Sequence, residues 1–382
     1  MKTILTGAQL AGAEQSSCDV VVDDGRIVAI GPAGIHRDGE VVDVTGTFLF
    51  PGLIDFHTHL THYRFMEHDS AALAAFRSVR QARSALRAGI TTVRDTGSFR
   101  ALDVELRAAI RSGVVDGPRM FCAAGFISMT GGHGHPRGVT ADGPAEVRRA
   151  ARQQLLRGAD FVKIMCSGGV LVPGTDTRVQ YSSAELTAAA EEAESYGTYL
   201  AAHAHPAAAI QRAVRAGARY IEHGSFIDQE TADLLAERGV TVTPTFSVYS
   251  MTSGDDGPDD LREASQRILE RKVEGFRLAL DAGVRWAVGS DSGTLTPASA
   301  IVDEMLFLHH EMGIDLRTVL REATKGNAER LGLTDVGEIA TGSRADIICV
   351  DGDPFVDPQA LRRVAVTVAG GHVYDWRNGA GE

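Results

Sequence analysis

Lysine is scarce in this sequence of 382 residues. Four of its 38 basic residues are lysines and the rest are arginines, and 50 acidic residues outnumber both together. The formal net charge is therefore −12 at pH 7. Because nucleic acids and anionic membranes attract positive surfaces, this balance argues against both as partners.

Cysteine and long apolar runs are also in short supply. The four cysteines, at positions 18, 122, 166 and 349, show no C-x-x-C spacing, so we expect free thiols in a reducing cytoplasm. No apolar stretch reaches the roughly 18 residues that a membrane-spanning helix needs. The sequence therefore predicts a cytoplasmic protein without disulfides or a membrane span.

Both ends of the chain have the pattern of short strands joined by turns. The segment "SCDVVVDDGRIVAIG" predicts a hairpin around Asp24 and Gly25, and "ADIICV" and "VAVTVAGGHVYD" repeat the pattern near the C-terminus. The opening "MKTILTGAQL" is interpreted as a first strand and not as a signal peptide, because its apolar run is short and broken. We expect residues 1–50 and 336–382 to pair as one composite β-sandwich.

The middle of the chain, residues 51–335, alternates short apolar runs with long amphipathic segments. One of these segments begins with a capping box, Ser182 followed by Glu185. Eight units of strand then helix predict an α/β fold of the (β/α)8 barrel type, whose chemistry lies at the carboxyl ends of the strands. The candidate strands are residues 52–57, 91–95, 119–124, 161–165, 199–204, 220–224, 241–246 and 285–291.

Side chains that can bind metal ions lie in or at the ends of five of these strands. His57 and His59 are two residues apart, so on an extended segment both imidazoles project to the same side and can share one ion. The full set comprises His57, His59, Lys163, His203, His223 and Asp291. In a barrel these positions converge, and the sequence therefore predicts a metal site.

Lys163 is unusual because it interrupts the apolar strand "FVKIM". Burial lowers the pKa of a lysine, and the neutral amine can add carbon dioxide to give a carbamate whose two oxygens can bridge two cations. The alternative is that Lys163 extends its ammonium group to the end of the strand or pairs with a carboxylate. The histidines and the aspartate at neighbouring strand ends favour the carbamate.

These motifs together resemble the amidohydrolase superfamily of metal-dependent hydrolases. The resemblance rests on "PGLIDFHTH", "FVKI", "AAHAH", "IEHG" and "GSDSGT", and covers essentially the whole chain. Further motifs, "TTVRDTG", "TGGHG", "VKIMCSGGV" and "QYSSAEL", resemble the branch with Xaa-Pro and Xaa-Arg dipeptidases and ochratoxin-type amidases. The resemblance implies a small-molecule substrate, and self-association is common among such barrels.

The resemblance also implies roles for the candidate ligands. It places His57, His59 and Asp291 on one zinc ion and His203 and His223 on a second, with carboxylated Lys163 between them. A hydroxide that bridges the two metals would attack an amide carbonyl. Asp291 would take its proton and pass it to the leaving amine.

Substrate-binding candidates come from the two long loops 125–144 and 166–182 and from the fifth strand. The resemblance assigns His133 of "TGGHG" to the scissile carbonyl oxygen, and Tyr181 lies in "QYSSAEL". His135 and Arg137 are candidates for binding a substrate carboxylate, or are solvated loop residues. His205 stands where proline-specific members often carry tyrosine; it either contacts substrate or is hydrogen-bonded near the site.

Three alternatives remain open from the sequence. A mononuclear deaminase or cyclic-amide hydrolase is disfavoured, because Lys163 is present and no glutamate follows in "HAHPAAAIQR". A non-catalytic scaffold is disfavoured, because every ligand type is retained. Within amide hydrolysis, the substrate is a dipeptide or N-acyl amino acid, or alternatively a carbamate, a urea or an N-acyl xenobiotic.

Overall fold

All eight strands predicted in the middle of the chain are present. The structure, a computed structural model, describes residues 2–13, 17–34, 38–61, 69–169, 175, 177–254, 259–293 and 295–377. Neighbouring strands pair in parallel. The strands are β6 (Leu53–Thr58), β7 (Ile90–Asp95), β8 (Arg119–Cys122), β11 (Val162–Met165), β12 (Leu200–Pro206), β13 (Ala218–Phe226), β14 (Thr241–Thr243) and β15 (Arg285–Trp286).

The strand pairing groups these strands in two parallel sheets, so it does not by itself confirm the single closed sheet of the predicted barrel. One sheet has the order β6-β7-β8, and the other has the order β10-β9-β11-β12-β13-β14-β15. The additional strands β9 (Ile127–Ser128) and β10 (Val139–Thr140) come from the predicted loop 125–144. The strands β8, with four residues, and β15, with two, form the edges at which the two sheets divide.

The segment that follows β15 continues beside β6 through separate hydrogen bonds. The amide of Phe56 donates to the carbonyl of Val288 at 3.0 Å, and the amide of Asp291 donates to the carbonyl of His57 at 2.8 Å. Asn327 Nδ2 donates to the carbonyls of Ile54 and Val288, both at 2.8 Å. These bonds hold the two predicted ligand segments, around residues 57 and 291, in fixed register.

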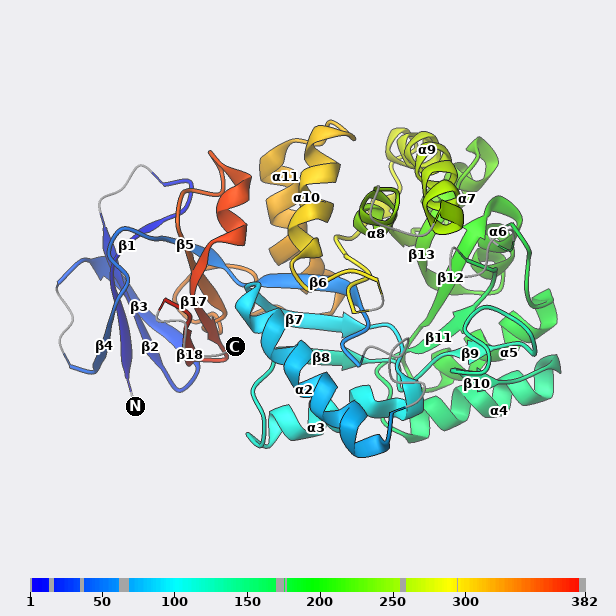
Figure 1. Cartoon of the computed structure of the whole chain (residues 1–382), viewed down its shortest axis with the longest axis horizontal. Coiled ribbons are helices and arrows are strands. Elements are labelled where there is room, and N and C mark those ends of the chain that lie inside the picture. Colours follow the sequence, from blue (N-terminus) through cyan, green and yellow to red (C-terminus); the bar gives the residue numbers. More distant parts are fainter. Residues whose placement is uncertain are drawn as a thin grey trace.

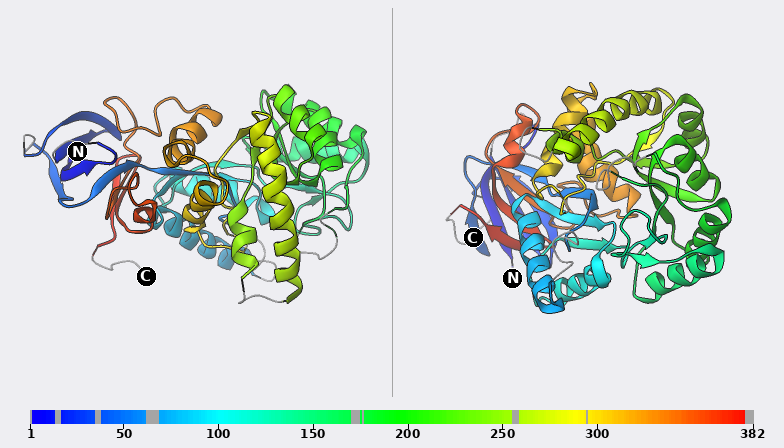
Figure 2. Two further views of the ribbon diagram at one scale, coloured as in Figure 1. Left: turned by 90° about the horizontal axis from the view of Figure 1, so that it is seen from above. Right: turned by 45° about the vertical axis from the view of Figure 1, so that its right-hand side comes forward.

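Helices form an outer layer around the strands (Figure 2). In α2 the buried residues Ala74, Ser78, Ala82 and Ala85 recur every three or four positions, so one stripe faces the sheet. The capping box of Ser182 and Glu185 is confirmed at the start of α5. The helices are α2 (Ala71–Arg87), α3 (Leu102–Arg111), α4 (Gly143–Leu156), α5 (Ser183–Ser195), α6 (Ala207–Arg215), α7 (Gln229–Glu237), α8 (Phe246–Thr252), α9 (Asp259–Asp281), α10 (Ala300–His310), α11 (Leu316–Arg321) and α12 (Asn327–Arg330), with short turns η1 (Phe99–Ala101), η2 (Glu322–Gly326) and η3 (Pro358–Arg362).

Strands from both ends of the chain share one further sheet at one end of the molecule (Figure 1). Its order is β18-β17-β16-β5-β1-β2-β3, with β4 beside β1. The predicted hairpin is confirmed, since β2 and β3 are antiparallel and both Asp24 and Gly25 have positive φ. The strands are β1 (Thr3–Leu10), β2 (Cys18–Asp23), β3 (Arg26–Pro32), β4 (Glu40–Asp43), β5 (Phe48–Pro51), β16 (Ile347–Val350), β17 (Val364–Ala369) and β18 (His372–Asp375).

The structure also bears on the predictions about cysteines and about membrane-spanning helices. All four cysteines are free, as predicted, and the structure shows that all four are also buried. Within the described part of the chain, no helix combines the length and the apolar character needed to cross a bilayer.

Candidate metal centre

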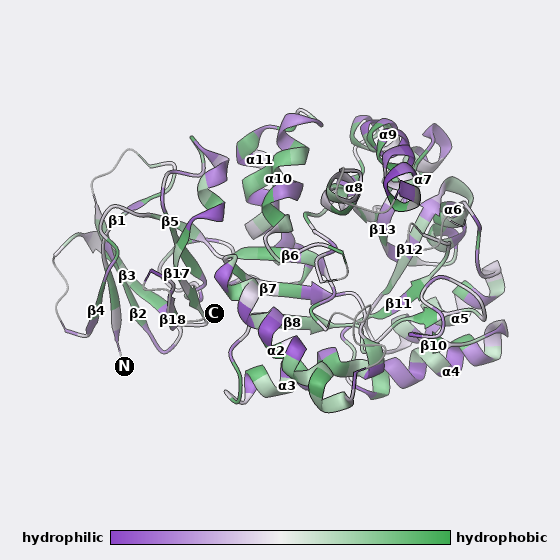
Figure 3. Cartoon of the chain, in the orientation of Figure 1, coloured by the Kyte–Doolittle hydropathy of each residue, from purple (hydrophilic) through white to green (hydrophobic). Residues whose placement is uncertain are grey.

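The six predicted ligands lie on, or shortly after, five parallel strands. β6 carries His57 and is followed by His59, while β11, β12 and β13 carry Lys163, His203 and His223. Asp291 follows β15. The four histidines and Lys163 are almost fully buried. Strand β7 changes from apolar to hydrophilic at its carboxyl end, where Arg94 and Asp95 lie (Figure 3).

Three of these side chains converge closely enough to hold one cation. Single ligand atoms of His57, His223 and Asp291 all lie within 4.8 Å of one another. The Nε2 atoms of His57 and His59 are each 3.4 Å from Oδ1 of Asp291. The ring of His203 lies 4.6 Å from that of His223, measured between centroids. The structure thus brings five of the six predicted ligands into one cluster.

The hydrogen bonds of the imidazoles leave lone pairs for a metal ion. His57 Nδ1 lies 2.7 Å from a carboxylate oxygen of Glu222, and His59 Nδ1 lies 2.7 Å from the carbonyl oxygen of Gly97. Both oxygens only accept, so each neutral ring carries its proton on Nδ1 and has its lone pair on Nε2. His57 Nε2 is buried without a hydrogen-bond partner in the described structure. The donor set therefore fits a divalent cation.

Glu222 is a functional residue that the sequence reasoning missed. Its second carboxylate oxygen accepts a hydrogen bond of 2.8 Å from Arg94, and both side chains are completely buried. The Arg94 guanidinium lies over the rings of Phe56 and Phe161, with centroid distances of 4.8 and 4.1 Å. Burial opposes the charged form of Glu222, but the neighbouring cations hold the pKa of this carboxyl well below its usual range.

Two predicted ligands have left-handed backbone conformations. His223 has a φ of 70° and Asp291 a φ of 55°. Such conformations cost about 1–3 kcal/mol for residues with a Cβ atom and persist where the surrounding structure enforces them. His223 lies within β13, and Asp291 lies in the segment that follows β15.

Lys163 lies in the environment that its predicted reaction requires. The side chain is 1% exposed. Burial lowers the pKa of this amine to about 8, and the Arg94 cation acts in the same direction, while Glu222 and Asp291 oppose it. With this pKa, roughly a tenth of the amine is neutral at pH 7.

Two further predicted histidines border the cluster. The ring of His133 stacks on that of His203 with a centroid distance of 4.4 Å. The ring of His205 stacks on that of His223 at 5.1 Å, and His205 Nδ1 lies 2.8 Å from the Ser225 hydroxyl. Both histidines are buried, which keeps them neutral by lowering the pKa of each.

The remaining substrate-side candidates lie in the two predicted loops, and the charge of Arg137 contributes to the lowered pKa of His133. His135 is exposed and Arg137 is partly buried in the same loop. The hydroxyl of Tyr181 donates to the carbonyl of Ala141 at 3.0 Å, so this hydroxyl is engaged within the fold. In the second predicted loop, residues 170–174 and 176 lie outside the described residues.

Lys272, a residue that the sequence reasoning did not single out, is buried behind the cluster. Its Nζ donates to the carbonyl of His223 at 2.8 Å and to the Ser225 hydroxyl at 3.4 Å. Burial lowers the pKa of Lys272, while Glu304 opposes this shift. The sequence indicated a buried lysine at position 163, because Lys163 interrupts an apolar strand. It did not indicate one at position 272, because Lys272 lies in a long amphipathic helix, α9, where a lysine is ordinary.

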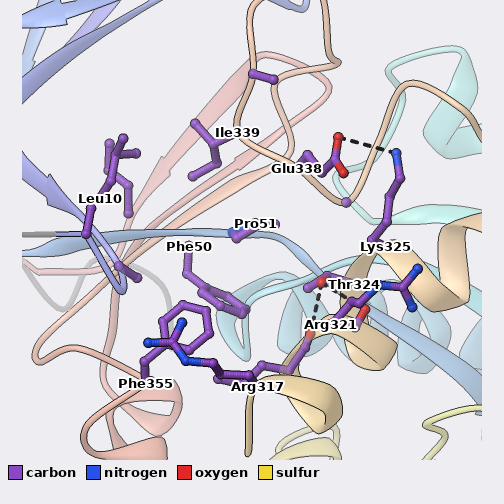
Figure 4. Close-up of a pocket in the computed structure, with 16 residues that line it drawn as sticks. Leu10, Phe50, Pro51, Arg317, Arg321, Thr324, Lys325, Glu338, Ile339 and Phe355 are labelled. Atoms are coloured by element: carbon purple, nitrogen blue, oxygen red, sulfur yellow. Dashed lines mark hydrogen bonds and ion pairs between the residues drawn. The ribbon is translucent and has the colours of Figure 1, made fainter.

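A separate cavity of about 560 Å³ lies between the terminal sheet and α11 (Figure 4). Leu10 and Phe50 form part of its apolar wall, and Arg317, stacked over Phe355 at 4.8 Å, lies at another side. None of the predicted site residues lines this cavity. The candidate metal centre is therefore distinct from it.

Buried imidazoles and a carboxylate at the ends of parallel strands, with helices outside, are the arrangement of an α/β hydrolytic enzyme. The model of the amidohydrolase family matches residues 48–374, and the chain belongs to this family. The family resemblance predicted from the motifs is thereby confirmed.

Relatives and solved structures agree with this assignment. Ochratoxinase from Aspergillus niger is 29% identical over 362 residues, which cover 83% of this chain and 74% of the relative. A prolidase complexed with N-methylphosphonate-L-proline is 31% identical with a TM-score of 0.87, covering 98% of this chain and 100% of that one. A Xaa-Pro dipeptidase with bound methionine is 30% identical with a TM-score of 0.86, covering 98% and 100%. The chain is a hydrolytic enzyme that acts on carbon–nitrogen bonds.

Replacement of Glu222 by glutamine tests the role of this carboxylate. The variant leaves the Arg94 cation buried without its counter-charge, so we expect the free energy of unfolding to fall by about 3 kcal/mol. Metal affinity should fall about 10- to 100-fold, because His57 loses the carboxylate that orients its ring. Denaturant unfolding and metal titration measure both effects. The control Glu230→Gln removes an exposed ion pair and should change stability by less than about 1 kcal/mol; equal effects of the two variants would contradict this role.

Acidification tests the buried neutral histidines. Burial lowers the pKa of His59 and of His133 to about 4, whereas an unfolded chain binds these protons below about pH 6.5. Protons therefore favour the unfolded state, and we expect the free energy of unfolding of the metal-free protein to fall by about 2 kcal/mol between pH 7 and 5.5 through these two residues. Urea titrations at several pH values measure this fall. It should be about 1 kcal/mol smaller in His133→Gln, and an identical fall in both proteins would contradict the assignment for His133.

Proposed function

We propose that this chain is a binuclear metal-dependent amidohydrolase that cleaves the amide bond of a dipeptide or an N-acyl amino acid. The observation that carries the proposal is the convergence of His57, His223 and Asp291 beside the buried Lys163. The charge of Lys163 acts on His59, His133 and His203, so this buried amine lies close to the imidazoles of the cluster. An amine in such a buried position has a lowered pKa, which it needs if it is to react with carbon dioxide.

The donor set suggests how two ions would be held. His57, His59 and Asp291 would bind one ion, His203 and His223 would bind the other, and the carboxylated Lys163 would lie between them. Imidazole and carboxylate donors favour zinc. When bound, two such ions supply Lewis acidity and lower the pKa of coordinated water to about 7.

Side chains of the protein would carry out the proton transfer and would stabilise the negative charge that develops on the substrate. The Asp291 carboxylate accepts the proton of the attacking water and delivers it to the leaving amine. The His133 ring is neutral, stacked on His203, and donates a hydrogen bond to the carbonyl oxygen as negative charge develops there. The burial of both rings excludes bulk water, which strengthens these interactions.

The substrate class is inferred from the relatives. The prolidase and the Xaa-Pro dipeptidase are named for the cleavage of dipeptides, and ochratoxinase is named for ochratoxin. His205 stands where proline-specific members often carry tyrosine, so we do not extend proline specificity to this chain. A carbamate, a urea or an N-acyl xenobiotic is the alternative class of substrate.

We also propose the division of the chain that the sequence predicts. Residues 51–335 would form a closed (β/α)8 barrel, which the hydrogen bonds between β6 and residues 288–292 support. Residues 1–50 and 336–382 would form one composite β-sandwich, which the pairing of β5 with β16 supports. Self-association and a cytoplasmic location stay predictions of the sequence.

Lys163→Ala tests the carboxylated amine. We expect the metal content to fall from about two ions per chain and hydrolysis to fall at least 1,000-fold, because both proposed sites share this ligand. Elemental analysis and ¹³C NMR after growth with labelled bicarbonate measure the metal content and the carbamate. The control Lys325→Ala removes a partly exposed lysine outside the cluster and should keep both. A fully metallated and active Lys163→Ala enzyme would exclude the proposed bridge.

A substrate panel tests the proposed reaction. Zinc-loaded protein should hydrolyse members of a dipeptide and N-acyl amino acid library, with release of the free amine as the measured signal. Turnover of carbamates or ureas, combined with inactivity across the library, would favour the alternative class. Release of ammonia from aminopurines or ring opening of cyclic amides, with neither of the other activities, would refute the proposal.

A further inference from the structure

The cavity between the terminal sheet and α11 has the size of a small-molecule binding site. Its volume of about 560 Å³ falls within the range of about 300–1,000 Å³ that is typical of such sites. Among the described residues that line it, none belongs to the candidate metal centre. A ligand in this cavity would therefore occupy a second site, away from the proposed hydrolysis.

One wall of the cavity is apolar and already formed. The rings of Phe50 and Phe355 meet edge to face, with centroids 5.8 Å apart, and Phe50 is only 3% exposed. Gly12 packs against the ring of Phe355 so closely that a Cβ atom in its place would lie 2.6 Å from a ring carbon. Leu10 and Ile339 extend this wall (Figure 4). An apolar group that enters here leaves water, which favours binding.

Three cations lie along another side of the cavity. Arg317, Arg321 and Lys325 follow one another at intervals of four residues, which places them on one face of the helical segment formed by α11 and η2. Among the lining residues that the structure describes, Glu338 is the one acidic side chain. Three cations against one carboxylate give the cavity a surplus of positive charge, although the whole chain has a net charge of −12. The cavity therefore favours an anion.

Two of these cations already have carboxylate partners, whereas the third does not. Lys325 Nζ lies 3.4 Å from Glu338, and Arg321 Nη1 lies 2.5 Å from Glu322. Arg317 forms no hydrogen bond or ion pair with any residue that the structure describes. Its stacking on an aromatic ring occupies one face of the guanidinium and leaves the N–H groups at the edge free. Such a planar fork binds a carboxylate with two parallel hydrogen bonds.

The free cation and the apolar wall form one continuous surface. The Arg317 guanidinium lies 4.8 Å from the centroid of Phe355, and Phe355 in turn contacts Phe50. A ligand can therefore place a carboxylate on Arg317 and an apolar chain along the two rings at the same time. One free guanidinium matches a single negative charge, because the other two cations are neutralised within the fold.

We propose that this cavity binds a small monocarboxylic acid with an apolar body, with the carboxylate on Arg317 and the body on Phe50, Leu10 and Ile339. A second copy of this chain would be a poorer occupant, because an inserted apolar side chain would leave the Arg317 cation without a counter-charge. The inference does not rest on the proposed function, since no residue of the candidate metal centre takes part in it.

Titration calorimetry of the zinc-loaded enzyme with straight-chain ligands tests both halves of the site. Octanoate should bind about 10-fold more tightly than hexanoate, because each buried methylene group strengthens binding about three- to fourfold. Octanamide has the same chain without the charge, and should bind about 10- to 100-fold more weakly than octanoate, because Arg317 loses its ionic partner.

Two variants assign the binding to this cavity. Arg317→Met keeps an apolar stem and removes the charge, so octanoate should bind about 10- to 100-fold more weakly while octanamide is unaffected. Ala340→Trp fills the cavity and should abolish the binding of both ligands. Both positions are exposed, so we expect both variants to fold. The control Arg149→Met replaces an exposed arginine of α4 and should bind octanoate as the wild type does.

Methyl NMR separates this cavity from the metal centre, where a carboxylate could also bind. The Ile339 signal, assigned from Ile339→Val, should shift when octanoate is added. The signal of Met165 should stay, because Met165 lies two residues from Lys163 on β11 and therefore on the same face of that strand.

Specific results would overturn the inference. Equal affinities for octanoate and octanamide, an undiminished affinity in Arg317→Met, or shifts confined to Met165 would each do so. Absence of octanoate binding, combined with dissociation of a self-associated form by Ala340→Trp in sedimentation velocity, would instead make the cavity an interface between copies. An enzyme that cleaves no amide would refute the proposed function alone, because none of these measurements uses turnover.

Discussion

The buried ion pair between Arg94 and Glu222 is the interaction on which the candidate site depends. Removing two charges from water is expensive, and the pair is tolerated because each partner has several contacts. The guanidinium stacks on aromatic rings and the carboxylate accepts a hydrogen bond from His57. The pair therefore fixes the ring of a predicted metal ligand. It is not the cause of the lowered pKa of Lys163, because burial lowers that pKa while Glu222 raises it.

The backbone connects this ion pair to the predicted ligands on the other side of the cluster. Glu222 and His223 are adjacent on β13, so the strand that anchors the ion pair also presents a ligand, in a left-handed conformation. Asn327 and the amide of Asp291 tie the segment after β15 to β6. The strain at residues 223 and 291 persists because neither end of the cluster can relax alone.

The sequence predicted the strands and the ligands because both depend on local patterns. Apolar runs marked all eight strands, and metal-binding residue types lay in or at the ends of five of them. It did not predict the division into two sheets, because the lengths of β8 and β15 are set by tertiary hydrogen bonding and not by propensity. It missed Glu222 and Lys272 for a related reason: a charge in "IEHG" or in an amphipathic helix looks ordinary until the structure shows that it is buried.

The scarcity of lysine acquires a physical meaning in this arrangement. Of four lysines, two are buried beside the cluster, whereas arginine supplies the surface charge and the Arg94 ion pair. An arginine stays protonated at any accessible pH and needs a carboxylate when it is buried. A lysine can lose its proton and react, as proposed for Lys163, or can present a compact donor, as at Lys272. Exchange of Lys163 for arginine would preserve the charge and abolish this reactivity, whereas at position 272 it would keep a donor on a larger, planar group.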